Sequence, residues 1–462
     1  MNVSLEFVMK SVGRAEVGDA ELFARMAHGK FAYDFSNKLW YKWDRNYWVP
    51  DRLESVNLMI GNEVSDEYQA ASDLAAAAEG EDQAAADLAD RAGKLHYVGR
   101  KRRVLDEGKH SPEVALTGDE WDSNPYVLAV GNGIVDLKSG KLTDGDPDDY
   151  VRTHTDTVYD PQATAPRWEK FLVEVFDGDY SLINFLQRLL GYGITGEHSE
   201  HILPVLWGSE GRNGKDTMLD TIRCVMGNHA KPVSQSVLVG GGGDLNKATP
   251  HICSLQGLRL AWASETKDGA RLNASQVKYI TGGGEIVARP MYGHPLSFMP
   301  SHLVMLITNF RPHADSDDKA LWSRVLLLPF TERFVDNPQG EHEHPRDSQL
   351  LGKLKSEASG ILNWLIKGCM DWQKNGLQIP DSIRAATEEY RVEEDTLGIF
   401  IDEVCVVSEG VTIKASDLYF HYTNWAGRKV MSRTAFGRKI TSRFEKKRKN
   451  DGNYYAGVGF RV

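Results

Sequence analysis

The sequence GSEGRNGKDT, at residues 208–217, lies between an apolar run and an amphipathic run. The preceding residues 202–207 (ILPVLW) predict a short buried strand, and residues 218–225 (MLDTIRCV) predict a helix. A glycine-rich loop with an embedded Gly-Lys, placed between a strand and a helix, is typical of a phosphate-binding loop. The glycines let backbone N–H groups approach the phosphates, and the helix N-terminus attracts anions. We therefore expect an α/β core that binds a nucleoside triphosphate at this loop.

The loop departs from the usual phosphate-loop spacing in two places. Counted back from Gly214, the expected first glycine falls on Ser209, so Gly208 lies one position too far away. Asp216 stands where a Ser or Thr hydroxyl normally binds Mg²⁺, and Thr217 follows one position later. A plain glycine turn before a helix is the alternative interpretation. Other parts of the chain have to decide between the two.

Length, hydropathy and cysteine usage limit the classes of protein to which this chain can belong. The 462 residues are too many for one simple core, so two to four domains are expected. No segment has the apolar length of a membrane span, and the first residues lack the pattern of a secretory signal. The four cysteines are scattered without zinc-type or disulfide-type spacing, which predicts a reducing, cytoplasmic location.

The net charge of −11 is distributed unevenly along the chain. Residues 411–462 contain twelve Lys or Arg against three Asp or Glu, which indicates a module that contacts nucleic acid. Helical periodicity is expected over 393–406, 416–427 and 432–449, followed by an Asp451-Gly452 turn between two strands. Helices, then a basic helix and a hairpin, are typical of a winged helix that binds duplex DNA. The cations predicted to project from the basic helix are Arg438, Lys439, Arg443, Lys446 and Lys447.

The N-terminal third predicts a mixture of helices and hairpins. Residues 31–51 (FAYDFSNKLWYKWDRNYWVPD) alternate like hairpin strands. Their tryptophans either stack on bases between the neighbouring cations or pack on one another, and we favour packing. Residues 64–95 predict exposed helices broken at Gly80, and residues 131–142 predict a hairpin. Residues 166–196 predict two amphipathic helices directly before the phosphate-loop segment.

Four further signals follow the phosphate loop in order. Residues 258–266 (LRLAWASET) predict a buried strand that ends near Glu265, and residues 302–310 (HLVMLITNF) predict another that ends at Asn309. Between them, residues 270–293 predict a helix carrying Lys278, a glycine turn and a hairpin. Arg324 precedes an apolar strand within residues 319–330 (KALWSRVLLLPF). Each of two residues has an alternative interpretation when taken singly. Glu265 is then a solvent-exposed residue at the end of a strand, and Arg324 is a salt-bridged arginine at the edge of a strand.

The order of these motifs resembles the ATPase core of superfamily 3 helicases of the phage and plasmid replication type, which are related to the poxvirus primase-helicase. Five motifs carry the resemblance: GRNGK (211–215), SET (264–266), KYITGGGEIVARPMYG (278–293), ITNF (307–310) and WSRVLLLPF (322–330). The resemblance covers about residues 124–335 well, the C-terminus moderately and residues 1–120 weakly. It implies an AAA+-like P-loop ATPase core, with an N-terminal α+β region and a C-terminal winged-helix domain.

The resemblance also implies roles for individual residues. Lys215 is expected to bind the β- and γ-phosphates, Glu265 to serve the metal and the attacking water, and Asn309 to contact the γ-phosphate. Arg324 resembles an arginine finger, which acts on the ATP of a neighbouring subunit. The Mg²⁺ ligand stays open among Asp216, Thr217 and Glu265. The expected ATP-binding residues are Gly208, Gly211, Arg212, Asn213, Gly214, Lys215, Asp216 and Thr217.

In this family the hairpin at 286–298 lines the central channel of a ring, generally a hexamer. Its tip, with Arg289, Tyr292 and His294, is expected to grip single-stranded DNA, helped by Lys278. The implied domains are an N-terminal α+β region, a helical region, the ATPase core, a helical lid or connector, and the winged helix. Their predicted boundaries are 1–120, 121–200, 201–345, 346–392 and 393–462.

The leading hypothesis is an ATP- and Mg²⁺-dependent DNA helicase of a phage, plasmid or mobile element, working as a homo-hexamer without membrane contact. An alternative is an oligomeric DNA-bound ATPase that acts as an initiator or regulator without processive unwinding. Primase activity is a third hypothesis. It is disfavoured because the first 120 residues contain neither zinc-type cysteines nor paired catalytic carboxylates.

Overall fold

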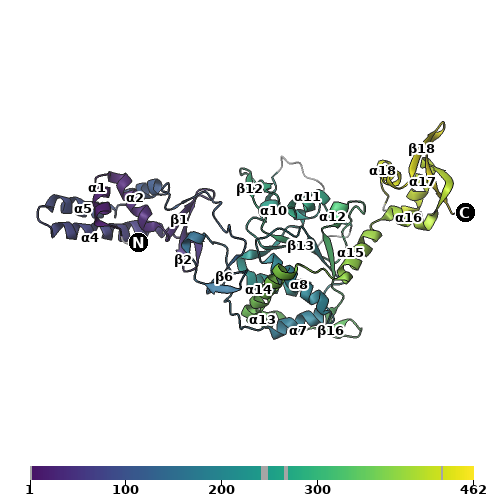
Figure 1. Ribbon diagram of the computed structural model, residues 1–462, viewed down its shortest axis with the longest axis horizontal. Helices are drawn as coiled ribbons and strands as arrows, with labels where there is room; N and C mark the ends of the chain where they lie inside the picture. Colours follow the sequence, from purple (N-terminus) through teal and green to yellow (C-terminus); the bar gives the residue numbers. More distant parts are fainter. Residues whose placement is uncertain (1–2, 241–247, 265–268, 428–429, 462) are drawn as a thin grey trace.

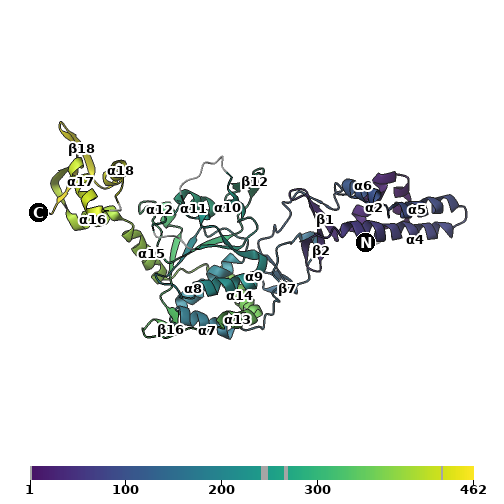
Figure 2. The same ribbon diagram turned by 180° about the vertical axis from the view of Figure 1, so that it is seen from behind.

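The computed structural model describes residues 3–240, 248–264, 269–427 and 430–461 of the chain. Figures 1 and 2 show an elongated molecule with an N-terminal part, a central α/β part and a C-terminal part arranged in a row. Helix α15 (Asp381–Glu393) leads from the central part to the C-terminal part. Among the described residues, no helix combines the length and the apolar character that crossing a bilayer requires.

The central part is built on a five-stranded sheet in which every neighbouring pair of strands is parallel. The order across the sheet is β14-β8-β13-β10-β9. Strand β8 therefore lies between β13 and β14, although both follow it by about a hundred residues or more. This confirms a mixed α/β fold with a parallel sheet. The strands are β8 (Leu203–Trp207), β9 (Ala230–Val233), β10 (Leu260–Ser264), β13 (Leu303–Thr308) and β14 (Val325–Pro329).

Alternate side chains of these strands enter two separate hydrophobic cores. Leu203 and Val205 of β8 pack on one face of the sheet, and Leu206 packs on the other. Because both faces of the sheet are buried, the strands have apolar residues at nearly every position. Short helices cover the first face: α10 (Pro250–Cys253), α11 (Ala274–Ile280) and α12 (Lys319–Trp322). Five helices cover the second: α7 (Pro166–Val175), α8 (Tyr180–Gly193), α9 (Lys215–Met226), α13 (Leu350–Ser356) and α14 (Ala358–Asn375).

The second core joins segments that the sequence placed in three different domains. It contains Trp168 and Leu189 from before the sheet, Leu206 and Met305 from the sheet itself, and Leu365 from after it. A small antiparallel sheet also contributes to this core. Its strands are β5 (Val127–Val130), β6 (Gly133–Asp136) and β7 (Lys141–Thr143), the last two forming the hairpin predicted at 131–142.

The N-terminal part has a core of its own, formed by helices that pack beside a small sheet. The helix pair predicted around Gly80 is confirmed, but the prediction that it is exposed is wrong, because Tyr68 and Leu88 are buried in this core. The favoured interpretation of the aromatic run is confirmed too, because Trp48 is buried and the rings of Trp43 and Trp48 lie 5.5 Å apart. The main helices are α1 (Leu5–Val12), α2 (Ala15–Ala27), α4 (Ser65–Ala76), α5 (Asp82–Lys94) and α6 (Val98–Gly108). The strands are β1 (Phe31–Asp34), β2 (Leu39–Asp44), β3 (Tyr47–Pro50) and β4 (Ala115–Leu116).

The C-terminal part is a separate small core of three helices and a three-stranded sheet in the order β17-β19-β18. Leu418, Tyr422, Phe436 and Ile440 are buried in it, as the helical periodicity predicts. The helices are α16 (Thr396–Val404), α17 (Ala415–Ala426) and α18 (Arg433–Arg443). The strands are β17 (Cys405–Lys414), β18 (Glu445–Lys449) and β19 (Gly452–Phe460).

The predicted basic helix over 432–449 is too long. Helix α18 ends at Arg443, because Phe444 is extended, with φ −133° and ψ 144°. The residues after it form β18, which pairs along its whole length with β19 around a turn at residues 450–451, one position earlier than predicted. Lys446 and Lys447 therefore belong to a strand and not to the helix. Helix propensity depends on neighbouring residues alone, so it could not predict the pairing of this segment with β19.

Candidate functional site

The loop between β8 and α9 has a backbone that only a few residue types adopt easily. Gly214, directly before the helix, has φ +85°, and a Cβ there would lie 2.8 Å from Cγ2 of Val175. Arg212 also has positive φ, at +67°. The chain therefore turns sharply into α9, whose first residue is Lys215. This places a helix N-terminus and its free backbone N–H groups at the end of the glycine loop.

Gly208 has a structural requirement that its motif spacing did not predict. A Cβ on Gly208 would lie 2.1 Å from Nδ2 of Asn213 and 2.9 Å from Nζ of Lys215. Asn213 is buried, and its Nδ2 donates to the carbonyl of Glu210 at 2.7 Å, across the loop. Any side chain at position 208 would displace these two groups. Gly208 therefore makes room for the lysine, although it stands outside the usual pattern.

Lys215 is 3% exposed and meets Asn309 directly. Its Nζ donates to Oδ1 of Asn309 at 3.2 Å and to the carbonyl of Gly208 at 3.4 Å. The two residues come together because β8 and β13 are neighbours and end side by side, with Trp207 opposite Thr308. Burial lowers the pKa of Lys215 to about 8, partly opposed by the charge of Asp216. An anion placed against Nζ would favour the protonated amine.

Arg324 lies at the opposite end of the sheet from the glycine loop. Val325 of β14 pairs with Leu203 of β8, so Arg324 stands level with the start of β8, whereas Gly208 follows its end. Arg324 thus lies beside Ile202, and the six positions from Ile202 to Gly208 correspond to about 20 Å of extended chain. The Arg324 guanidinium donates to the carbonyl of Ala320 at 2.6 Å, and its Nε has no partner among the described residues. Within one chain, Arg324 does not share a site with Lys215.

The structure describes two of the three candidate metal ligands, Asp216 and Thr217. Asp216 is exposed and Thr217 is half-buried, both in the first turn of α9 beside Lys215. Their oxygens are of the type that Mg²⁺ prefers, and Mg²⁺ commonly needs only one or two protein ligands besides phosphate and water. Glu265 lies outside the described residues. Within the described residues, no group of three or more His, Cys, Asp or Glu is arranged to hold a metal ion.

A cavity of about 550 Å³ opens beside the glycine loop. One wall is the loop itself at residues 209–211 and 213, a second follows β14 at 330–333, and a third is the segment 339–343. The buried Glu332 binds His342 at 2.9 Å and His344 at 2.7 Å, while Arg333 pairs with Glu210 at 2.9 Å. The hydrogen bond and charge of Glu332 raise the pKa of His342. Sequence analysis missed these residues, since no motif marks them.

The predicted channel hairpin is present, with β11 (Ile286–Ala288) paired to β12 (Leu296–Phe298). Arg289, Tyr292 and His294 all lie in the connection between these strands, and Tyr292 is fully exposed with φ +60°. Lys278 is on α11 as predicted, but its Nζ binds Oδ2 of Asp318 at 3.0 Å. The hairpin tip is therefore open to a ligand, whereas Lys278 is occupied by an ion pair.

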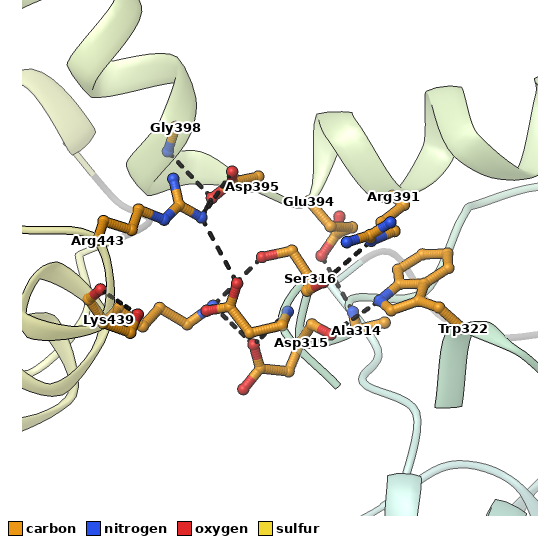
Figure 3. Close-up of polar contacts among 12 residues, drawn as sticks. Ala314, Asp315, Ser316, Trp322, Arg391, Glu394, Asp395, Gly398, Lys439 and Arg443 are labelled. Atoms are coloured by element: carbon orange, nitrogen blue, oxygen red, sulfur yellow. Dashed lines mark hydrogen bonds and ion pairs between the residues drawn. The ribbon is translucent and has the colours of Figure 1, made fainter. Parts of the chain in front are cut away.

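The cations of α18 do not all project outward, as the sequence had predicted. Lys439 and Arg443 point toward the central part and form ion pairs with carboxylates there (Figure 3). Arg438 is exposed, and so are Lys446 and Lys447 on β18. The prediction of five outward cations on one helix is wrong. Lys439 and Arg443 are covered by a segment more than a hundred residues earlier in the chain, and Lys446 and Lys447 lie on β18.

Comparison with known families finds a match in the first half of the chain. Residues 20–177 match the family model described as "D5 N terminal like". This span runs from α2 to the end of α7 and its following turn, and so includes much of residues 1–120. The motifs had shown only a weak resemblance there. The resemblance thus extends further toward the N-terminus than the sequence motifs indicated.

Several curated viral proteins are similar to this chain. "Putative helicase L207/L206" of Acanthamoeba polyphaga mimivirus is 28% identical over 322 aligned residues, covering 66% of this chain and 33% of the relative. "Putative primase C962R" of African swine fever virus is 24% identical over 327 residues, with the same two coverages. "Putative helicase 022R" of Frog virus 3 is 23% identical over 409 residues, covering 72% and 42%. The chain spans about a third of the length of the first two relatives.

Among solved structures, the C-terminal region of NrS-1 without ligand aligns over 95% of this chain and 98% of its own length. The identity is 9% and the TM-score is 0.48.

Proposed function

Because this chain is a relative of the poxvirus-type primase-helicases, we propose that it is an ATP-dependent DNA helicase. It would act in the replication of a virus, phage, plasmid or other mobile element. The observation that carries the proposal is the 3.2 Å contact between Lys215 Nζ and Asn309 Oδ1 at the end of two adjacent parallel strands. A cation from a glycine loop and an amide from the next strand meet where the γ-phosphate of ATP is expected.

The triphosphate would enter between Lys215 and Asn309. The loop N–H groups and the N-terminus of α9 would hold its phosphates, and Mg²⁺ would take oxygens from ATP and from Asp216 or Thr217. When bound, Mg²⁺ neutralises charge on the phosphates. The cavity beside residues 209–213 has the volume of a small-molecule site and is the expected place for the base and ribose.

We infer that the active form is a ring, in which Arg324 reaches the ATP of the neighbouring subunit. The separation of about 20 Å between Arg324 and the glycine loop of its own chain supports this inference. Closed rings arise when a head-to-tail contact repeats around an axis, and a homo-hexamer is the expected size. The exposed tip with Arg289, Tyr292 and His294 would then line the channel and contact one DNA strand.

We propose that the C-terminal part is a winged helix that binds duplex DNA. Its helices are followed by a hairpin, and β18 carries four exposed cations, from Lys446 to Lys449. Such a wing would lie along the phosphate backbone. We also propose a cytoplasmic site of action in a host cell, which agrees with four free cysteine thiols.

A forked DNA duplex with a labelled strand tests the helicase proposal against its alternative. With ATP and Mg²⁺, a helicase releases the labelled strand, whereas an initiator or regulator binds and hydrolyses without release. The variant with Lys215 replaced by Met serves as the control for contaminating helicases. Hydrolysis without strand release, across several fork polarities and tail lengths, would favour the initiator.

The lowered pKa of Lys215 predicts how ATP binding depends on pH. Phosphate favours the charged amine, so the bound form has a higher pKa than the free form at about 8. Below pH 8 the amine is already protonated and affinity is nearly constant. Above it, binding takes up a proton, and affinity should fall by up to about tenfold per pH unit. Titration with a fluorescent ATP analogue between pH 7 and 9.5 measures this.

Lys215→Arg is the matched control for the pH profile, since a guanidinium stays protonated over this range. The phosphate itself titrates near pH 6, below the window. The ATP affinity of the Lys215→Arg variant should therefore be constant from pH 7 to 9.5. An equally flat profile in the unmodified chain would contradict the assignment of Lys215 as the phosphate-binding amine.

The wing predicts a change in the salt dependence of DNA binding. Replacing Lys446 and Arg448 with Gln should weaken duplex binding and reduce the slope of log affinity against log salt by about two. Fluorescence anisotropy of the full chain over a salt series measures the slope. Lys170→Gln, which removes an exposed cation from α7, is the control and should leave the slope unchanged. Equal slopes in both variants would rule out the wing as a phosphate-binding surface.

A further inference from the structure

The segment 309–318 joins the predicted γ-phosphate contact to the predicted arginine finger. It begins at Asn309, directly after β13, and ends at Asp318, which caps α12 just before Arg324. Arg311 within it stacks on Trp207, the last residue before the glycine loop, with its guanidinium 4.0 Å from the ring centre. The segment therefore touches the candidate ATP site at Asn309 and Trp207, and its far end leads to Arg324.

The connector helix α15 holds the same segment from one side. Arg391 Nε donates to the carbonyl of Ser316 at 3.2 Å, and the backbone N–H of Ala314 donates to Glu394 at 3.0 Å (Figure 3). Glu393 pairs with Arg311 at 2.6 Å, and Glu394 with His313 at 3.1 Å. The path from the ATP site to the C-terminal part thus runs along the backbone of this segment and through its hydrogen bonds and ion pairs with residues 391–394.

Helix α18 of the C-terminal part binds the segment from the other side. Lys439 Nζ lies 2.6 Å from Oδ1 of Asp315, 3.1 Å from Oδ2 of Asp317 and 3.3 Å from Oγ of Ser316. Arg443 donates to both oxygens of Asp395 at 2.8 Å and lies 3.5 Å from Asp317. Figure 3 shows Lys439 and Arg443 directed at these carboxylates. We call Asp315, Asp317 and their two cationic partners the acidic clamp.

The cations of the clamp are partly shielded from water, whereas the side chains of Asp315 and Asp317 are 43% and 44% exposed. The side chains of Lys439 and Arg443 are 19% and 26% exposed. Burial alone would lower the pKa of Lys439, but its hydrogen bonds to Asp315 and Asp317 hold that pKa above its usual value. Both cations are charged and committed to carboxylates in this state. Lys278 is similarly paired, with Asp318 of the same segment.

We propose that Asp315 and Asp317 of the acidic clamp occupy Lys439 and Arg443, which otherwise bind the phosphates of duplex DNA. The clamp thereby couples DNA binding by α18 to the ATP site. The proposal rests on the DNA-binding and ATP-binding roles given above. A carboxylate pair and a phosphate present the same kind of anionic oxygens to Lys and Arg. The ligand is therefore the backbone of duplex DNA, competing with Asp315 and Asp317.

Nucleotide provides the second half of the coupling. A γ-phosphate between Lys215 and Asn309 has to break their direct hydrogen bond, which moves the first residue of the segment. We expect this movement to loosen the clamp, free Lys439 and Arg443, and tighten binding of duplex DNA. By thermodynamic reciprocity, DNA must then tighten binding of ATP by the same factor.

The test compares Asp315→Asn/Asp317→Asn with the unmodified full chain. Anisotropy of a labelled duplex is measured at fixed salt with and without a non-hydrolysable ATP analogue. Without nucleotide, the double variant should bind duplex about tenfold more tightly, the value of roughly two phosphate contacts. The unmodified chain should tighten at least about fivefold on adding the analogue, and the variant less than twofold.

A matched control separates the clamp from a general change of charge. Asp402→Asn/Glu409→Gln removes two exposed carboxylates from the same C-terminal part and leaves the clamp intact. It should raise affinity only slightly and keep the response to nucleotide. Asp315→Glu/Asp317→Glu retains the charges and should also keep that response. Thermal unfolding of all variants verifies that each is folded.

Three results would overturn the clamp. The first is a clamp variant that binds DNA no more tightly than the charge control. The second is full retention of the nucleotide response by that variant. The third is the absence of any nucleotide response in an unmodified chain that hydrolyses ATP and binds duplex. An unmodified chain that neither hydrolyses ATP nor binds DNA would instead overturn the proposed function, and the clamp with it.

Discussion

Replacing Arg324 with Ala should lower the rate of ATP hydrolysis by about 10³- to 10⁵-fold. The affinity for ATP should stay nearly unchanged, because Arg324 lies about 20 Å along the sheet from the glycine loop of its own chain. An arginine finger stabilises charge that develops in the transition state, so its loss affects turnover much more than binding. Steady-state hydrolysis and titration with a fluorescent ATP analogue measure the two quantities separately.

Mixed oligomers test whether Arg324 acts between subunits. A chain with Arg324→Ala retains its glycine loop, and a chain with Lys215→Met retains its finger. When the two inactive variants are mixed, some interfaces combine an intact loop with an intact finger, and hydrolysis should reappear. Arg223→Ala, an exposed arginine of α9, is the control and should hydrolyse normally. Full hydrolysis by Arg324→Ala, or no recovery on mixing, would rule out the finger in trans.

Replacing Lys215 with Met should abolish measurable hydrolysis and weaken ATP binding by about ten- to a hundredfold, the value of a charge-assisted hydrogen bond. The same change should leave the free protein as stable as before, or more so. Lys215 is 3% exposed and no carboxylate pairs with it among the described residues, so a methionine of similar length removes a buried charge. Loss of function without loss of stability would distinguish a binding lysine from a structural one.

Thermal unfolding with and without nucleotide gives the readout for Lys215→Met. A ligand that binds only the folded state raises the unfolding temperature, by an amount that grows with the logarithm of the ligand concentration divided by Kd. ATP with Mg²⁺ should therefore stabilise the unmodified chain and have little effect on the variant. Lys170→Met, on the surface of α7, should respond to ATP like the unmodified chain. Equal stabilisation of both lysine variants would contradict the assignment.

The sequence alone predicted the strand, loop and helix around Lys215 correctly, because each depends on the periodicity of about ten neighbouring residues. It also predicted that Asn309 follows a buried strand. The reason for Gly208 was not predictable, since it depends on how Asn213 and Lys215 fold back over the loop. The cavity walls at residues 330–333 and 339–343 were missed because these residues differ in type and carry no motif.

At the C-terminus, local pattern identified the buried faces of α17 and α18, but it extended α18 too far into what is β18. The reason is that a strand forms through its partner, here β19, and helix propensity does not register that partner.

Local sequence therefore determined which segments become helices and strands, and which residue types stand at their ends. Tertiary structure alone decided which of those ends meet. It brought Lys215 to Asn309, placed Arg324 at the opposite end of the strands, and paired Lys439 with Asp315 across more than a hundred residues. The physical reason is that backbone periodicity is set by neighbours in the chain. Ion pairs and strand order are set by packing between segments that the sequence keeps apart.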